Sequence, residues 1–150
     1  MKKRVLFDTN IILDFLLERQ PFFSESTIAL NIASQGKVSG FVSAHAISTL
    51  FYVLSKKIST EKSKEVISEL LNTLSVAPVT GKVIKQAVDS KFKDFEDAVS
   101  YYSAFEEKVS IIVSRNVKDF SKSDIPVMLP EVFISNILYS SASAGTKLEN

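Results

Sequence analysis

Short apolar runs and longer helical patterns alternate along the chain. One apolar run at residues 5–7 ends abruptly at Asp8, and another at 109–113 has four apolar residues in five positions. Short apolar runs rich in β-branched residues are typical of buried strands. The other strand candidates are residues 39–42, 76–79 and 126–129. The pattern therefore predicts four or five short strands.

Between these runs, apolar residues recur every three to four positions, which is typical of helices buried on one face. Residues that cap helix N-termini precede four of these stretches: Ser43, Thr60, Thr80 and Asp94. The predicted helices cover residues 11–18, 21–36, 43–54, 60–74, 80–88, 94–107 and 130–138. Strands separated by one or two helices predict βαβ units and a parallel sheet.

Composition narrows the class of protein. The pattern predicts one domain over 1–139 and a disordered tail over 140–150, where Ser, Ala and Gly are frequent. The absence of cysteine excludes disulfides and thiolate zinc sites. The single histidine, His45, excludes a multi-histidine metal site, and we expect it to be structural or solvated. No apolar run approaches the roughly 18 residues of a membrane span, so we expect a cytoplasmic protein with no membrane contact.

Polar residues flank the predicted strands at points that parallel topology brings together. Asp8 ends the first strand, and Asp94 and Asp97 stand at the start of the predicted helix 94–107. Asn116 and Asp119 follow the next predicted strand, at 109–113. Ligands of open parallel sheets bind beyond the carboxyl ends of the strands. We therefore expect these five side chains to line one pocket. A site built from oxygen ligands favours Mg²⁺ or Mn²⁺.

Each of these residues also has a purely structural interpretation. Asp94 is a suitable helix N-cap, and Asp97 complements the helix dipole. Asn116 and Asp119 are common turn residues. Asp8 is the hardest to explain in this way, because a charge at the end of a buried strand is costly unless it is paired or bound to a cation.

Basic residues lie close to the acids in the sequence, although the net charge is only +1. Lys93 precedes Asp94, and Arg115 and Lys118 lie on either side of Asn116. Such side chains can hold the phosphates of a nucleic acid. An ordinary mixed-charge surface explains them equally well, so both interpretations stay open.

Three segments resemble, in order, the motifs of PIN-domain proteins. The run VLFDTNIILD at 5–14 resembles the family's opening motif. FEDA at 95–98, with Ala104 on the same helix, resembles the third motif, and VSRNVKDF at 113–120 resembles the segment after the fourth strand. The likeness spans about residues 4–133. Three ordered motifs are more specific than the Asp-Thr-Asn triplet alone.

The resemblance implies a three-layer α/β/α sandwich with a central parallel sheet. It also implies a metal-dependent endoribonuclease that hydrolyses phosphodiester bonds in RNA. Many relatives are toxins of VapBC-type toxin–antitoxin pairs, so a small antitoxin partner and a homodimer are expected. The apolar faces of helices 43–54 and 60–74 are consistent with such contacts.

Carried over by position, Asp8 and Asp97 would be the catalytic metal ligands. Asn116 would stand where many members have a further acid, and Asp94 and Asp119 would be additional metal ligands. The supporting residues, through hydroxyl groups or by orienting the first loop, would be Thr9, Ser114 and Asn10. Arg115, Lys118 and Lys93 would contact the RNA.

Two departures from the family pattern reduce the number of acids. Thr49 stands where members usually have a glutamate, and Asn116 replaces another acid. One alternative is therefore a degenerate domain that binds RNA or protein without cleaving. Another is a phosphatase or dehalogenase with a covalent intermediate on Asp8, although Asn10 stands where those families have a second aspartate.

Overall fold

The computed structural model describes the backbone of residues 1–149 and the side chains of residues 1–140. Its centre is a parallel sheet of five strands in the order β3-β2-β1-β4-β5. The strands are β1 (Arg4–Phe7), β2 (Ser39–Ser43), β3 (Leu74–Ala77), β4 (Ile111–Val113) and β5 (Val127–Met128). The predicted parallel sheet is confirmed.

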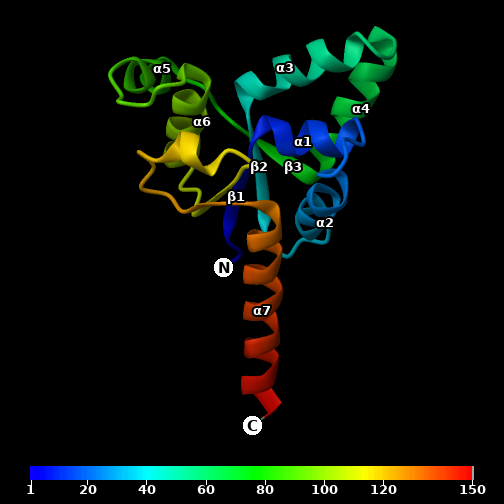
Figure 1. The fold of residues 1–150 in the computed structure, drawn as a ribbon, viewed down its shortest axis with the longest axis vertical. Coiled ribbons are helices and arrows are strands. Elements are labelled where there is room, and N and C mark those ends of the chain that lie inside the picture. Colours follow the sequence, from blue (N-terminus) through cyan, green and yellow to red (C-terminus); the bar gives the residue numbers. More distant parts are fainter. Residues whose placement is uncertain (150) are drawn as a thin grey trace.

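Helices cover both faces of the sheet, which confirms the three-layer arrangement (Figure 1). Helices α1, α2, α3, α4 and α7 contribute to the core on one face, and α6 packs on the other with α5 against it. They are α1 (Thr9–Leu16), α2 (Phe23–Ser34), α3 (Ala44–Ser55), α4 (Thr60–Thr73), α5 (Gly81–Val88), α6 (Phe95–Glu106) and α7 (Pro130–Glu149), with a short 3-10 helix η1 (Val117–Phe120). Among the described helices, none has the length and apolar character needed to cross a membrane.

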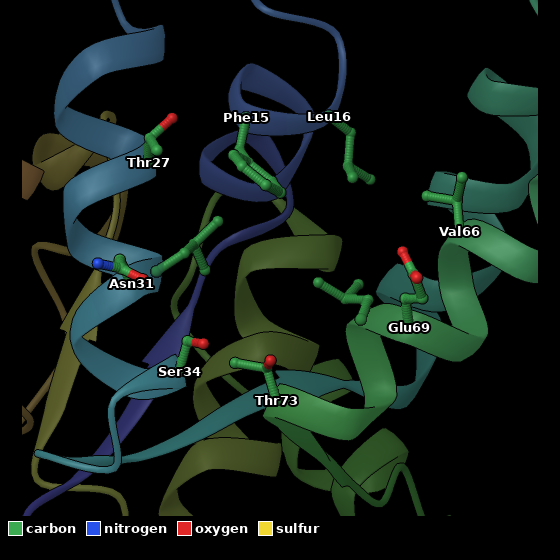
Figure 2. Close-up of a pocket in the computed structure, with 10 residues that line it drawn as sticks. Phe15, Leu16, Thr27, Asn31, Ser34, Val66, Glu69 and Thr73 are labelled. Atoms are coloured by element: carbon green, nitrogen blue, oxygen red, sulfur yellow. The ribbon is translucent and has the colours of Figure 1, made fainter.

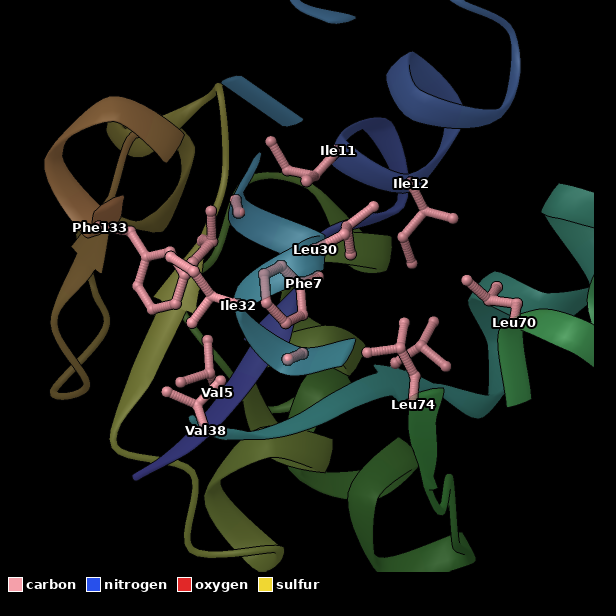
Figure 3. Close-up of a cluster of buried hydrophobic side chains, with 14 of the residues drawn as sticks. Val5, Phe7, Ile11, Ile12, Leu30, Ile32, Val38, Leu70, Leu74 and Phe133 are labelled. Carbon is pink, nitrogen blue, oxygen red and sulfur yellow. The ribbon is translucent and has the colours of Figure 1, made fainter. Parts of the chain in front are cut away.

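The central strand β1 is buried on both faces. Val5 and Phe7 point into the core shared with α1, α2 and α7, where Phe7 meets Phe133 edge to face at 5.8 Å between ring centroids (Figure 3). Leu6 points to the opposite core, beside Tyr101 of α6. Successive residues of a strand face opposite sides, so β1 joins the two cores. The end of β1 is therefore firmly supported by both layers of helices.

Some boundaries differ from the prediction. Leu74 begins β3 instead of ending α4, because it is buried and pairs in register with Gly40 of β2. Ser59, not Thr60, caps α4, and its hydroxyl accepts the backbone N–H of Lys62 over 3.1 Å. Tertiary packing and backbone geometry decide between neighbouring residues of similar local propensity.

The last helix also runs further than the sequence indicates. We predicted a helix over 130–138 and disorder over 140–150, whereas α7 continues to Glu149. Most of that tail lies outside the residues whose side chains the structure describes. The division into a domain over 1–139 and a separate tail stays a prediction.

Candidate metal centre at the sheet edge

The carboxyl ends of β1 and β4 lie side by side in the middle of the sheet. Phe7 is in register with Val113, and the backbone N–H of Asp8 donates to the carbonyl of Val113 over 2.9 Å. The chain moves from β1 to β2 on one side and later returns to β4 on the other. Such a reversal of strand order is where open α/β sheets bind ligands.

Asp8 connects β1 to α1 and is only 8% exposed. Its Oδ1 accepts the backbone N–H of Thr9 over 2.9 Å, and its Oδ2 accepts the hydroxyl of Ser114 over 2.8 Å. Burial raises the pKa of the Asp8 carboxyl, while these hydrogen bonds and the charges of His45 and Arg115 oppose that rise. The carboxylate is thus fixed in one orientation at a site that disfavours its negative charge.

The three residues expected to support Asp8 differ in how they lie relative to it. Ser114 makes the expected hydroxyl contact, whereas Thr9 contacts Asp8 through its backbone N–H. Asn10 lies in the first turn of α1, immediately after Thr9. Since Asp8 is also the N-cap of α1, the first loop and the start of this helix are one unit.

A second carboxylate, Asp97, lies in the first turn of α6. Asp94 caps this helix, and its Oδ1 accepts the backbone N–H of Asp97 over 3.0 Å. Burial, together with the charges of Asp94, Asp8, Asp119 and Glu96, raises the pKa of Asp97 to about 7. Nearby like charges produce such a rise. Asp8, Asp94 and Asp119, the other acids that the sequence singled out, are therefore all close enough to Asp97 for their charges to affect its pKa.

The loop after β4 brings the third segment to the same place. The hydroxyl of Ser114 accepts the backbone N–H of Asn116 over 3.0 Å while it donates to Asp8. The carbonyl of Asn116 accepts the backbone N–H of Asp119 over 3.0 Å. This chain of hydrogen bonds ties the start of η1 to Asp8.

The three basic candidates occupy different environments. Lys93 and Lys118 are exposed, close in the chain to Asp94 and Asp119 respectively. Arg115 instead contacts Asp14 within the protein, through Nε at 2.6 Å and Nη2 at 3.2 Å.

Two residues that the sequence did not suggest as members of the site also lie in this region, His45 and Glu96. The ring of His45 shares hydrogen bonds with the hydroxyls of Ser43 at Nδ1 (2.6 Å) and Ser100 at Nε2 (3.4 Å). Burial lowers the pKa of His45, and the charges of Glu96 and Asp8 oppose this. His45 follows the carboxyl end of β2, so the rule that identified Asp8 could also have identified this histidine.

Comparison with known families agrees with this architecture. The sequence profile of the PIN domain matches residues 4–118. The chain belongs to the PIN-domain family. This PIN domain is 34% identical to Ribonuclease VapC1 of Aquifex aeolicus (strain VF5) over 136 residues, which cover 87% of this chain and 93% of that protein.

Solved structures share the fold of this PIN domain. The structure of VapBC-1 from nontypeable Haemophilus influenzae aligns with a TM-score of 0.64 and 17% identity, over 85% of this chain and 98% of that one. A toxin–antitoxin complex from Klebsiella pneumoniae aligns with a TM-score of 0.62 and 24% identity, over 84% and 97%. At these identities the likeness establishes the fold alone.

The side chains of this PIN domain suit a divalent metal ion in their chemistry. Mg²⁺ takes oxygen ligands and retains waters, so one or two carboxylates with substrate phosphates are sufficient. Among the side chains that the structure describes, no three acidic or histidine residues are already placed as a ready metal-binding group. A cation between Asp8 and Asp97 would relieve the repulsion that contributes to the raised pKa of Asp97.

A groove of about 270 Å³ lies at the other end of α1 from Asp8 (Figure 2). It lies between α1, α2 and α4, and its walls include Phe15, Leu16, Leu30 and Val66. Asn31 and Glu69 add polar groups to its lining. The groove is therefore a surface separate from the site of Asp8 and Asp97.

Proposed function

We propose that this PIN domain is a Mg²⁺- or Mn²⁺-dependent endoribonuclease and the toxin of a toxin–antitoxin pair. The observation that carries the proposal is the group of carboxylates near the junction of β1 and β4, where burial and the charges of the neighbouring acids together raise the pKa of Asp97 to about 7. The 34% identity to a ribonuclease supports the same class of reaction.

Asp8 and Asp97 would hold the ion with their carboxylate oxygens. When bound, such an ion would supply Lewis acidity at the phosphate and a more acidic water. In the overall hydrolysis the oxygen of water becomes bonded to phosphorus, the bond from phosphorus to the leaving ribose oxygen breaks, and that oxygen takes a proton from the water. Ser114 keeps Oδ2 of Asp8 oriented throughout. Lys93 and Lys118 hold flanking phosphates of the RNA, since both are exposed near the acids.

The remaining polar residues adjust the charge of the site. Asp94 and Asp119 add negative charge near Asp97 and act as further metal ligands, directly or through water. Asn116 contributes an uncharged amide where an acid is expected in many relatives. We therefore expect weaker metal binding than in a site with four acids.

A cleavage assay on single-stranded RNA tests this function. Wild type should cleave with Mn²⁺ and stop when EDTA is added, and Asp8→Asn should be nearly inactive. Cleavage by Asp8→Asn at the wild-type rate would reveal a contaminating nuclease and remove the mechanism.

A catalytically inactive binding module is the second candidate, and Thr49 is the observation that favours it. Thr49 lies on α3 one turn after His45, so the two residues share a helix face near the site. The usual acid is therefore missing from this side. RNA binding by wild type without any cleavage on varied RNAs would support this second function. Phosphate release from small phosphoesters would instead indicate a phosphatase acting through Asp8.

We also propose an antitoxin partner and a homodimer. The groove of Figure 2 is a candidate surface for an apolar segment of an antitoxin. A shallow apolar hollow between α3 and α4, with Phe51 and the exposed Leu71 in its lining, is a candidate dimer contact. Light scattering should give twice the monomer mass, and a monomer at every concentration would remove the dimer. Coexpression with a candidate antitoxin should yield a complex that no longer cleaves RNA.

A further inference from the structure

Asp14 is a fully buried acidic residue on α1. It lies on α1 among Ile11, Ile12 and Leu13 and is 0% exposed. An isolated buried carboxylate is very costly unless it is paired and hydrogen-bonded. Asp14 is not among the candidate metal ligands, so the residues that it contacts must explain why a carboxylate is buried here.

The nearer of two cationic partners of Asp14 is Arg115, 101 positions away in the sequence, while Nη1 of Arg19 lies 3.8 Å from Oδ1. Nε of Arg115 donates to Oδ2 of Asp14 over 2.6 Å, and Nη2 donates to Oδ1 over 3.2 Å. The guanidinium carbon lies 4.0 Å from the ring centroid of Phe22. A planar guanidinium that is bonded on one edge and stacked on one face has a fixed orientation, which lysine could not reproduce.

The backbone of Arg115 lies between two residues of the metal site. Ser114 donates to Asp8, and its hydroxyl accepts the backbone N–H of Asn116. A shift of Arg115 would therefore move both neighbours. Because Asp14 and Asp8 are both at α1, the ion pair links the loop after β4 to the same helix that starts at Asp8.

We propose that Asp14 and Arg115 are a pair of positioning residues that set the loop 114–119 against Asp8, and that Arg115 does not act by binding RNA phosphates. This inference rests on the proposed function for its catalytic consequence. Its structural part, the placement of the loop, can be measured without metal or RNA. Residues that orient metal ligands typically change metal affinity or activity by about 10–100-fold when they are replaced.

The test compares Asp14→Asn, Arg115→Lys and Arg115→Gln with the matched control Lys118→Gln, which removes a positive charge from the same loop at an exposed position. We expect Asp14→Asn and both Arg115 variants to lower Mn²⁺ affinity and kcat about tenfold, with KM for RNA changed less than about twofold. Lys118→Gln should do the reverse, raising KM and reducing the salt dependence of RNA binding by about one phosphate contact.

Asp14→Asn is the decisive variant, because a fully buried carboxyl cannot touch RNA. If Arg115 served RNA binding, releasing it from Asp14 would leave Mn²⁺ affinity unchanged and would leave RNA affinity equal or higher. That result would overturn the proposal. So would a wild-type salt slope in Lys118→Gln combined with a reduced slope in Arg115→Gln.

Amide hydrogen exchange of the metal-free proteins separates this proposal from the proposed function. Exchange over 114–119 should accelerate in Asp14→Asn and stay at the wild-type rate in Lys118→Gln. If wild type neither binds Mn²⁺ nor cleaves RNA, the proposed function fails while exchange still tests the positioning. If a single variant does not fold, the double variant Asp14→Asn with Arg115→Gln removes the buried carboxylate and its nearer cation together. Wild-type exchange over 114–119 in the folded variants would overturn the positioning role.

Discussion

The hydroxyl of Ser114 donates to Oδ2 of Asp8 over 2.8 Å, although the two residues are 106 positions apart in the sequence. Both side chains are buried where β1 and β4 end side by side. The orientation of the central carboxylate therefore depends on the pairing of the first strand with one formed late in the chain.

Ser114→Ala should weaken both the site and the fold, because Asp8 loses one of its two described donors. We expect a loss of about 1.5–3 kcal/mol in the free energy of unfolding, the range for hydrogen bonds to charged groups. The rate of RNA cleavage should fall about tenfold or more. Urea unfolding and cleavage kinetics measure the two effects. Ser110→Ala, at an exposed position just before β4, is the control. It should change neither the free energy of unfolding nor the cleavage rate strongly.

Asp8→Asn should reduce RNA cleavage about a hundredfold or more, since it preserves shape but removes the charge that holds the ion. Circular dichroism should show a folded protein. Asp119→Asn should cost less, because Asp119 is exposed and contributes only one of several charges near Asp97. A greater loss in Asp119→Asn than in Asp8→Asn would reverse the assignment of the principal ligand.

Thr49→Glu should tighten Mn²⁺ binding if the site is weak for want of an acid on α3. Calorimetric titration with Mn²⁺ measures the change, and Thr49→Gln is the control of equal size without the charge. Activity that appears only in Thr49→Glu would identify a nuclease scaffold that has lost its catalytic function. Equal Mn²⁺ affinity in the Glu and Gln variants would show that this helix face does not reach the ion.

The metal-free protein should lose stability as the pH rises from about 4 to 7. The pKa of Asp97 is raised from its ordinary 3.8 to about 7, so in this window the folded state binds a proton that the unfolded state releases. Below about pH 4 Asp97 is protonated in both the folded and the unfolded state, so its ionisation begins to lower the free energy of unfolding only above that pH. In thermal unfolding with EDTA, the stability of Asp97→Asn relative to wild type should increase as the pH approaches 8. Parallel pH profiles of the two proteins would contradict this prediction.

Mn²⁺ should have the opposite pH dependence. A cation competes with the proton on Asp97, so its affinity should rise as the pH increases through about 7. The thermal shift caused by Mn²⁺ should therefore be larger at pH 8 than at pH 6, and Asp97→Asn should lose most of it. An equal shift at both pH values in wild type would remove Asp97 as a ligand.

Local signals in the sequence were sufficient for the elements that carry the acids. The apolar run before Asp8 and the cap at Asp94 depend on neighbours in the chain, and both have the expected structure. Parallel topology then indicated which strand ends would meet. The boundary at Leu74 was predicted wrongly because its pairing with Gly40 is a long-range contact.

Contacts between side chains that are far apart in the sequence could not be predicted from such local signals. The charge of Arg115 is equally compatible with RNA or with an internal carboxylate, and only the folded chain brings Asp14 within 2.6 Å. His45 was expected to be structural or solvated, because it stands near the start of a predicted helix. Its proximity to Asp8 follows from the adjacency of β2 and β1, and its proximity to Glu96 follows from the contact of His45 with Ser100 on α6.

The place of β4 beside β1 also determines when the candidate metal centre can form during protein synthesis. A ribosome that has translated as far as Asp97 has already made two of the principal acids, yet one edge of β1 still lacks its neighbour and Asp8 lacks the hydroxyl of Ser114. The nascent polypeptide therefore cannot hold Asp8 in its final orientation until Ser114 has left the ribosome. If the proposed function is correct, cleavage of RNA has to wait for the same event.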